Sequence, residues 1–295
     1  MKKTIIAFVS LFSLIVPIQA HAATPKTMVI IDTGVDISHP AIKNNIIYEV
    51  CVSNYNSCPN KQSFMEGPGS ATLTSDMAKV AAWQHGTKVA SAATQTDPNV
   101  KIIELRCASL LTTIFINCNN NTLATSLSWI LANKDKFNIG AVVSPLGSYT
   151  GGCDLSAPYV SAINALNKAG VAVIFPTGND FKYTAIDNPA CLPGVLAISA
   201  IDDKNRLALY ANYSSRVDFA ASGNLNVAIP NNQYVLDYGT SLAVAVFGAD
   251  WLKILNTKNL SYLDEYNLIK KTADPYTNIM VKQNVLDINI TKALQ

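Results

Sequence analysis

Short apolar runs rich in valine, isoleucine and leucine recur along the chain, at residues 28–31, 102–105, 141–143, 171–175 and 195–198. Runs of this length and composition are typical of strands buried on both faces of a parallel sheet. Stretches with helical periodicity lie between them. This alternation of strands and helices predicts a doubly wound α/β fold, in which functional sites lie at the carboxyl ends of the strands.

Three segments carry the apolar spacing of a helix. Residues 122–137 place four apolar side chains on one helical face, namely Leu123, Leu127, Ile130 and Leu131. Residues 156–169 begin with Ser156 and Pro158 and are followed by Gly170, which are start and stop signals. Residues 242–255 form a third, strongly apolar segment.

The first 22 residues have the pattern of a secretory signal peptide. Lys2 and Lys3 precede an apolar run at residues 4–16, Pro17 ends the run, and Ala20-His21-Ala22 matches an A-x-A cleavage site. A membrane anchor is the alternative, but the run is shorter than the roughly 20 apolar residues that a spanning helix needs. We therefore expect export, with the protein secreted or periplasmic and without a membrane span after cleavage.

Composition excludes several functional classes. The whole chain has 295 residues, 22 basic and 20 acidic, and removal of the signal peptide leaves 273 residues with 20 of each. A formally neutral chain is not held by nucleic-acid phosphates. With 49% hydrophobic and 14% charged residues it is also not disordered. We expect one large domain over residues 23–295.

All six cysteines follow the signal peptide, which favours disulfides in an oxidising compartment. The polar tracts 53–75 and 107–121 are expected to be surface loops, and two cysteine pairs would close short loops there. This leaves a third pair, although six cysteines allow fifteen pairings in principle. The pairs are Cys51–Cys58, Cys107–Cys118 and Cys153–Cys191. A zinc site is disfavoured because no CxxC pair occurs, and we expect no metal requirement.

Two residues are candidates for acid–base chemistry. Asp32 follows the apolar run 28–31 directly, where a carboxylate would emerge at the end of a strand, although alone it also fits a turn before Gly34. Beyond the signal peptide the only histidines are His39 and His85. His39 precedes a proline in a turn, whereas His85 has small neighbours that suit a packed site, so we prefer His85 as the base.

A nucleophile and an oxyanion donor are also present. Ser241 is the candidate nucleophile, and it follows Gly239 and Thr240 and precedes an apolar helix. A serine at this position could simply be the N-cap of the helix. The unpaired N–H groups at a helix start also favour developing negative charge, as a catalytic site requires. Asn179 lies just past the strand at residues 171–175, where it fits either a turn or a side-chain donor to an oxyanion.

Together these segments resemble the subtilisin-like serine proteases, or subtilases. IDTGVDISHP, HGTKVAS and GTSLAVA resemble the Asp, His and Ser motifs of that family, in the same order, and FPTGND resembles its AAGN segment. VVSPLGS resembles the NMSLG substrate-binding strand, and NPACLPGVLAISAID and the closing segment from IKKTADP also match. The resemblance covers nearly all of the chain after the signal peptide.

The resemblance implies a mostly parallel, seven-stranded sheet with helices on both faces, and endopeptidase activity on protein or peptide substrates. It implies Ser241 as nucleophile, His85 as base and Asp32 as the residue that orients His85. The Asn179 side chain and the Ser241 N–H would form the oxyanion hole. Substrate-binding residues would come from two segments: Pro145, Leu146 and Gly147, and Pro176, Thr177 and Gly178.

The sequence departs from the family pattern at several positions. These are Lys88 in place of a second His, Ser91 in place of Gly, Ala245 in place of Pro, Pro145 in place of Ser, and Pro176 and Thr177 in place of two Ala. None removes a triad group. Pro145 has no N–H, so it can only accept a hydrogen bond from substrate. Pro176 and Thr177 are expected to narrow the primary specificity pocket.

No prodomain is recognisable, because Asp32 follows the predicted cleavage site by ten residues. We expect folding without a covalent prodomain, assisted by the disulfides or by a separate helper.

The short catalytic unit also resembles the A subunit of subtilase cytotoxins, which implies a separate binding subunit. A catalytically impaired binding protein is another alternative. An α/β-hydrolase is disfavoured because Ser241 lacks a GxSxG elbow. We expect no required cofactor; family members often bind calcium, but the sequence identifies no ligand for it.

Overall fold

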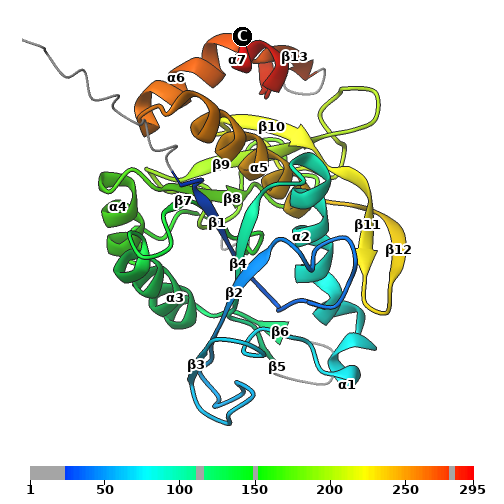
Figure 1. The fold of residues 1–295 in the computed structure, drawn as a ribbon. Helices are drawn as coiled ribbons and strands as arrows, with labels where there is room; N and C mark the ends of the chain where they lie inside the picture. Colours follow the sequence, from blue (N-terminus) through cyan, green and yellow to red (C-terminus); the bar gives the residue numbers. More distant parts are fainter. Residues whose placement is uncertain (1–23, 111–115, 149–151, 279–282) are drawn as a thin grey trace, which may run out of the picture.

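The structure is a computed structural model that describes residues 24–110, 116–148, 152–278 and 283–295. The predicted signal peptide lies outside the described residues. A ten-stranded sheet forms the centre of the molecule (Figure 1). Its strands follow the order β13 (Asp274–Asn278), β14 (Gln283–Asp287), β10 (Phe219–Ser222), β9 (Leu196–Ile201), β8 (Ala172–Pro176), β7 (Ile139–Val143), β1 (Thr27–Asp32), β4 (Lys101–Arg106), β2 (Ile46–Val52) and β3 (Phe64–Glu66).

The sheet is mostly parallel, as expected, but larger than the predicted seven strands. The seven neighbours from β10 to β2 all pair in parallel. β14 adds a short parallel pairing through Ala220 and Asp287, and the outermost strands β13 and β3 are antiparallel. These added strands lie outside the seven central ones, and their sequences lack the continuous apolar runs that identified the central strands.

Helices cover both faces, and alternate residues of the central strands point to opposite layers. Met28 and Ile30 pack with α2 (His85–Thr96) and α5 (Thr240–Lys258), whereas Val29 and Ile31 pack with α3 (Asn120–Asn133) and α4 (Val160–Lys168). Figure 1 shows these helix pairs on either side of the sheet. The remaining helical elements are α1 (Ser75–Ala78), the 3-10 helix η1 (Ala81–Gln84), α6 (Tyr262–Thr272) and α7 (Ile290–Leu294).

Helix ends differ from the predicted ones where polar side chains bind the backbone. Asp154 accepts hydrogen bonds from the backbone N–H and the hydroxyl of Ser156, so this segment forms a turn and α4 begins only at Val160. α3 ends at Asn133, four residues before the predicted end. α5 extends beyond the predicted segment at both ends and stops at Asn259, which adopts a left-handed conformation.

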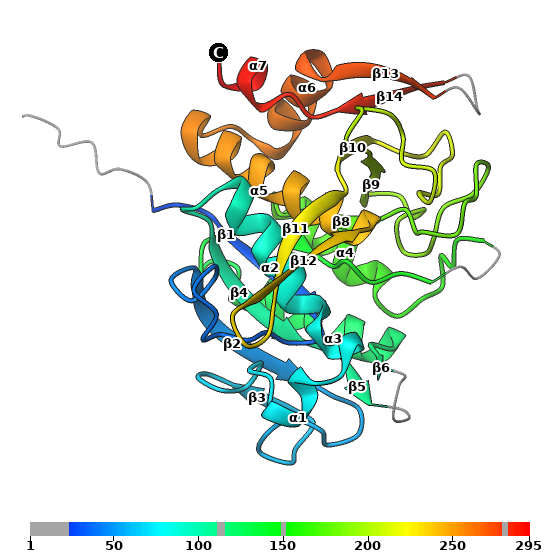
Figure 2. The ribbon, with the colours of Figure 1, turned by 90° about the vertical axis from the view of Figure 1, so that its right-hand side faces the viewer.

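The polar tracts contain more pairing than the predicted loops. β3 lies in the first tract, and the second contains a pairing of β5 (Ser109–Leu110) with β6 (Ile116–Asn117). A hairpin of β11 (Asn224–Ile229) and β12 (Gln233–Tyr238), which the sequence pattern did not identify, lies over α2 and leads directly into α5 (Figure 2). This hairpin brings the chain to the edge of the sheet where the candidate site lies.

Three disulfides join the six cysteines in the predicted pairs. The Cα–Cα distances are 5.8 Å for Cys51–Cys58, 5.2 Å for Cys107–Cys118 and 5.7 Å for Cys153–Cys191. Two of the pairs close the polar tracts onto the sheet, and the third ties the loop before α4 to the loop before β9. Among the described residues, no helix is both long and apolar enough to span a membrane.

Candidate active site

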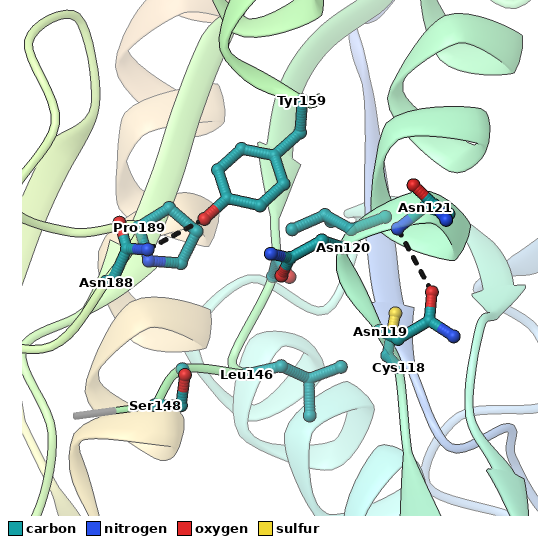
Figure 3. A pocket seen from close by; sticks show the side chains of 12 residues that line it. Cys118, Asn119, Asn120, Asn121, Leu146, Ser148, Tyr159, Asn188 and Pro189 are labelled. Carbon is teal, nitrogen blue, oxygen red and sulfur yellow. Dashed lines mark hydrogen bonds between the residues drawn. The ribbon is translucent and has the colours of Figure 1, made fainter. Parts of the chain in front are cut away.

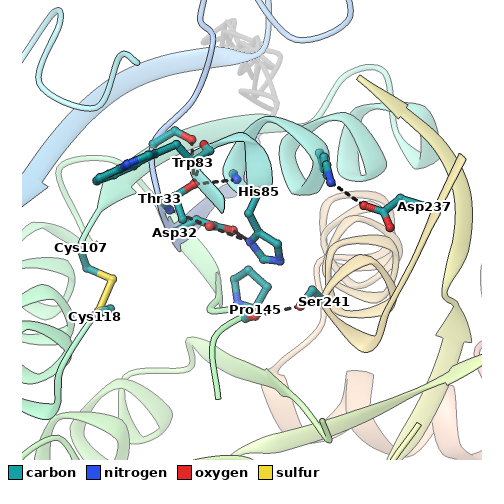
Figure 4. A network of polar contacts seen from close by, with 12 residues as sticks. Asp32, Thr33, Trp83, His85, Cys107, Cys118, Pro145, Asp237 and Ser241 are labelled. Atoms are coloured by element: carbon teal, nitrogen blue, oxygen red, sulfur yellow. Dashed lines mark hydrogen bonds and ion pairs between the residues drawn. A yellow bond between two sulfur atoms is a disulfide. The ribbon is translucent and has the colours of Figure 1, made fainter. Parts of the chain in front are cut away.

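Asp32 and His85 form a hydrogen-bonded pair at the carboxyl end of β1. Asp32 is fully buried, and its carboxylate oxygens lie 2.8 and 2.9 Å from Nδ1 of His85 (Figure 4). The carboxylate also accepts the backbone N–H of Thr33 at 2.6 Å. A buried carboxylate needs such partners. The pair therefore holds the imidazole with Nδ1–H toward Asp32 and leaves Nε2 available to a reacting group.

The neighbours of His85 fix where its helix begins. His85 is the first residue of α2, and the Gly86 N–H donates to the hydroxyl of Thr33 at 3.0 Å. The same hydroxyl donates to the Trp83 carbonyl at 3.0 Å. A Cβ at Gly86 would overlap the Gly34 carbonyl oxygen. The small residue after His85 is thus required for the close approach of α2 to the β1 loop.

The environment of His85 favours its protonated form. Desolvation alone would lower its pKa, but the charge and hydrogen bond of Asp32 outweigh it and raise the pKa above the usual 6.5. Lys88 and Asp237, which form an ion pair at 2.7 Å, act in opposite directions. The side chain is 31% exposed, so the imidazole can meet a substrate.

Ser241 lies in the first turn of α5, and its hydroxyl donates to the Pro145 carbonyl oxygen at 3.0 Å (Figure 4). Within the part of the chain that the structure describes, no hydrogen bond joins Ser241 to His85. Both side chains nevertheless line the same cleft. The serine is therefore near the imidazole, with its hydroxyl turned to the neighbouring strand end.

The side chain of Asn179 is oriented by the residue before the serine. Its Oδ1 accepts hydrogen bonds from the backbone N–H and the hydroxyl of Thr240, at 2.9 and 3.0 Å. Because a backbone N–H can only donate, the accepting atom must be the amide oxygen. Among the described residues no hydrogen bond engages the amide Nδ2, so this group can donate to a ligand in the cleft.

A cleft of about 470 Å³ joins these groups. Its walls come from Pro145, Leu146 and Gly147 on one side and from Pro176, Gly178 and Asn179 on the other. Thr177 does not line it, contrary to expectation: the side chain is fully buried, because successive residues at a strand end point to opposite faces. Of the two departures from the family pattern at this wall, only Pro176 lines the cleft.

A second hollow of about 640 Å³ continues the cleft at Leu146 and Gly147 (Figure 3). Tyr159, Asn188 and Pro189 line one side of it, and residues 118–121 line the other. The Asn188 amide donates to the Tyr159 hydroxyl at 2.8 Å. The two hollows together give an elongated depression along residues 145–147.

The remaining departures from the family pattern have structural partners. Lys88 pairs with Asp237 on β12, and the Ser91 hydroxyl accepts the backbone N–H of Ala228 at 3.0 Å, so both link α2 to the hairpin. Ala245 is buried in the core beside the sheet. His39, the other histidine, is buried and bonded to the Ala41 N–H and to the Gln233 carbonyl, away from the cleft.

Three polar residues of this region were not identified from the sequence. Asp180 and Asp187 line the cleft, and Asn212 is fully buried and bonds both carboxylates. Asp180 directly follows Asn179, so its place beside the site could have been inferred. Asp187 and Asn212 come from separate loops, and only the fold brings them to the cleft.

A family model described as the subtilase family matches residues 27–284. This chain belongs to the subtilase family. A thermophilic serine proteinase from Bacillus sp. (strain AK1) is 27% identical over 84% of this subtilase and 56% of the relative, and the major intracellular serine protease of Bacillus subtilis is 27% identical over 72% and 63%. The chain spans about half the length of several curated relatives that it matches.

Solved structures share the subtilase fold at low identity. A protease from Pseudoalteromonas arctica has a TM-score of 0.73 at 19% identity, with 91% of this chain and 89% of the other covered. The epidermin leader peptide processing serine protease from Staphylococcus aureus has a TM-score of 0.71 at 20% identity, with coverage of 93% and 75%.

The described residues of this subtilase contain no group of three or more His, Cys, Asp or Glu side chains placed to hold a metal ion.

Proposed function

We propose that this subtilase is a serine endopeptidase that hydrolyses peptide bonds of protein or peptide substrates through an acyl-enzyme. The observation that carries the proposal is the hydrogen bond of the buried Asp32 to His85, which shares one cleft with Ser241 at the start of a helix. Family membership and the serine proteases among its relatives support the same reaction.

In the proposed reaction, Ser241 Oγ attacks the substrate carbonyl carbon and His85 Nε2 takes the hydroxyl proton. Asp32 keeps Nδ1 protonated and stabilises the imidazolium, which then donates the proton to the leaving amine. Water later attacks the acyl-enzyme, again with His85 as the base. The Ser241 hydroxyl must first turn from Pro145 toward His85, and we propose that it does so by rotation about its Cα–Cβ bond.

Substrate itself would favour this rotation. An extended peptide running along residues 145–147 presents its N–H groups to the carbonyl of Pro145, the acceptor that the Ser241 hydroxyl uses in the free enzyme. Pro145 has no N–H and can contribute only this acceptor. When a substrate N–H competes for it, the Ser241 hydroxyl is displaced toward His85.

The proposed oxyanion hole consists of Asn179 Nδ2 and the Ser241 backbone N–H. The N–H lies in the first turn of α5, where backbone donors have no partner within the helix. Charge that develops on the substrate oxygen would be stabilised there without reorganisation of the site.

The test is hydrolysis of unfolded casein and of internally quenched peptides by purified protein. The parent is expected to cleave internal bonds, and Ser241→Ala is expected to be inactive although folded. A folded parent that cleaves no substrate in a broad peptide library would contradict the proposal and favour the alternative of a binding protein or of a toxin subunit with another partner.

Export and folding without a required cofactor remain part of the proposal. A protein exported as proposed should begin at Ala23, which N-terminal sequencing of the exported product measures. Activity that survives EDTA treatment would support independence from calcium. Refolding of residues 23–295 with and without a separate helper, in oxidised and in reduced form, tests whether the disulfides suffice.

A further inference from the structure

The floor of the cleft beside Ser241 is acidic. Asp187 lines the cleft and is only 7% exposed. Its backbone N–H donates to the Thr177 carbonyl at 2.9 Å, and the next residue exchanges two backbone hydrogen bonds with Ser148, at 3.0 and 3.1 Å. A Cβ placed on Gly147 would lie 3.6 Å from Asp187 Oδ2, and one placed on Gly178 would lie 2.5 Å from it, so the carboxylate lies between the two walls.

One oxygen of this carboxylate has no partner. Oδ1 of Asp187 accepts a hydrogen bond from Asn212 Nδ2 at 3.1 Å, and the same amide donates to Asp180 Oδ2 at 3.1 Å. Among the described residues no donor bonds Oδ2 of Asp187, and a Cβ placed on Gly178 would lie 2.5 Å from it. Only a glycine at this wall leaves room for that oxygen.

The surroundings make the carboxylate poorly solvated. Desolvation, reinforced by the charge of Asp180, raises the pKa of Asp187 to about 6, while Lys182 and the bond from Asn212 oppose the rise. The other charged or titratable residues that line the cleft are His85, Asp180 and Lys88, and Lys88 is paired with Asp237. The wall residues 145–147, Pro176 and Gly178 carry no charge. A half-satisfied carboxylate at the end of such a pocket is complementary to a cation that can supply charged N–H donors.

We propose that Asp187, with Asp180 nearer the rim, makes the cleft select substrates that carry arginine or lysine immediately before the scissile bond. The inference rests on the proposed peptide-bond hydrolysis. With the substrate carbonyl oxygen at Asn179 and the substrate backbone along residues 145–147, the side chain attached to the attacked carbonyl enters the space between the two walls. The floor of that space is Asp187.

The decisive substrates are two fluorogenic peptides that differ only in arginine or citrulline before the scissile bond, because citrulline has almost the same shape without the charge. The parent is expected to favour arginine by about 100-fold in kcat/KM, as for a charge-assisted hydrogen bond in a buried site. Asp187→Asn, which keeps an acceptor for Asn212, should reduce this ratio to below about 5-fold. Asp135→Asn removes the same charge from a 90% exposed side chain and should leave the ratio as in the parent.

The ratio should also depend on pH. Protonation of Asp187 removes the charge that attracts the substrate, so the preference for arginine should fall as the pH is lowered from 8 to 5. Protonation of His85 slows both peptides equally and cancels in the ratio. A preference that is unchanged at pH 5 would contradict a role for the Asp187 carboxylate.

A binding measurement tests the predicted arginine preference independently of the proposed peptide-bond hydrolysis. Calorimetry with Ser241→Ala and the two cleavage products, ending in arginine or citrulline, should show at least about tenfold tighter binding of the arginine product at pH 8. Equal binding, or an arginine ratio that survives Asp187→Asn, would overturn the inference and leave peptide-bond hydrolysis intact. Conversely, selective arginine binding by a protein that cleaves nothing would support the pocket assignment and contradict the proposed reaction.

Discussion

Replacement of Asn179 by Asp isolates the proposed oxyanion donor. The Oδ1 of Asn179 already accepts two hydrogen bonds from Thr240, at 2.9 and 3.0 Å, and a carboxylate oxygen can accept both. The substitution therefore keeps the acceptor of both Thr240 groups and replaces the Nδ2 donor by a negatively charged oxygen. Asn179→Ala, in contrast, removes the donor and also the acceptor of two Thr240 groups.

Both variants should lose rate, the aspartate variant at least as much because its charge repels the oxyanion, and the two should differ in stability. Loss of one oxyanion donor raises the barrier by about 2.7–4 kcal/mol, which corresponds to a decrease of roughly 10²–10³ in kcat. Thr240 is fully buried, so the alanine variant should also lose about 1–3 kcal/mol of unfolding free energy for unpaired donors. The aspartate variant should unfold as the parent does.

The assay combines steady-state kinetics with urea denaturation of the parent, both variants and Asn54→Asp. Asn54 is an exposed loop residue, so this control makes the same chemical change away from the site. KM should change little, because the interaction is made mainly in the transition state. An Asn179→Asp enzyme within about fivefold of the parent kcat would refute the assignment of Nδ2 as an oxyanion donor.

Three further predictions follow from burial, charge and cross-linking. Because the pKa of His85 is raised and the base must be neutral, the acid limb of kcat/KM against pH should have its midpoint above 6.5; a midpoint below 6 would contradict the Asp32 contact. Replacing Cys153 and Cys191 by alanine opens a loop with a sequence separation of 38 and should cost about 4 kcal/mol in a denaturation curve, whereas a change below 1 kcal/mol would show that this cross-link does not constrain the unfolded chain. Burial raises the pKa of Glu265 from 4.5 to about 9, so its contribution to stability is present below pH 4.5 and is lost as the pH rises toward 9. In that window the parent should lose up to about 1.4 kcal/mol of unfolding free energy per pH unit relative to Glu265→Gln. Parallel plots of unfolding free energy against pH for the two proteins would contradict this.

The central strands were predictable because strands buried on both faces have continuous apolar sequences. Residues 28–31 lie within β1, and all but the first residue of the run 171–175 lie within β8. Asp32 ends β1 and Asn179 follows β8, at the same edge of the sheet. The edge strands β3 and β13 have no continuous apolar run. The start of α4 was wrong because Ser156 serves a turn with Asp154, a competition between side-chain and helical hydrogen bonds that spacing alone does not resolve.

The candidate site shows the same division. The residues of the proposed triad lie in motifs that can be identified one by one. The structure places His85 and Ser241 in one cleft and bonds the buried Asp32 to His85. The direction of the Ser241 hydroxyl toward Pro145 and the burial of Thr177 depend on side-chain orientation, which the sequence does not record. Asp187 reaches the cleft only because two walls and Asn212, distant in sequence, meet around it.

The most direct test of the proposed reaction is mass spectrometry of folded protein after treatment with a fluorophosphonate. This reagent forms a stable adduct only with an activated serine, so the account predicts a single adduct that maps to Ser241, with strongly reduced labelling in His85→Ala. Folded parent protein without an adduct, or with the adduct on another serine while Ser241 is unmodified, would contradict the assignment of Ser241, His85 and Asp32 as a catalytic triad.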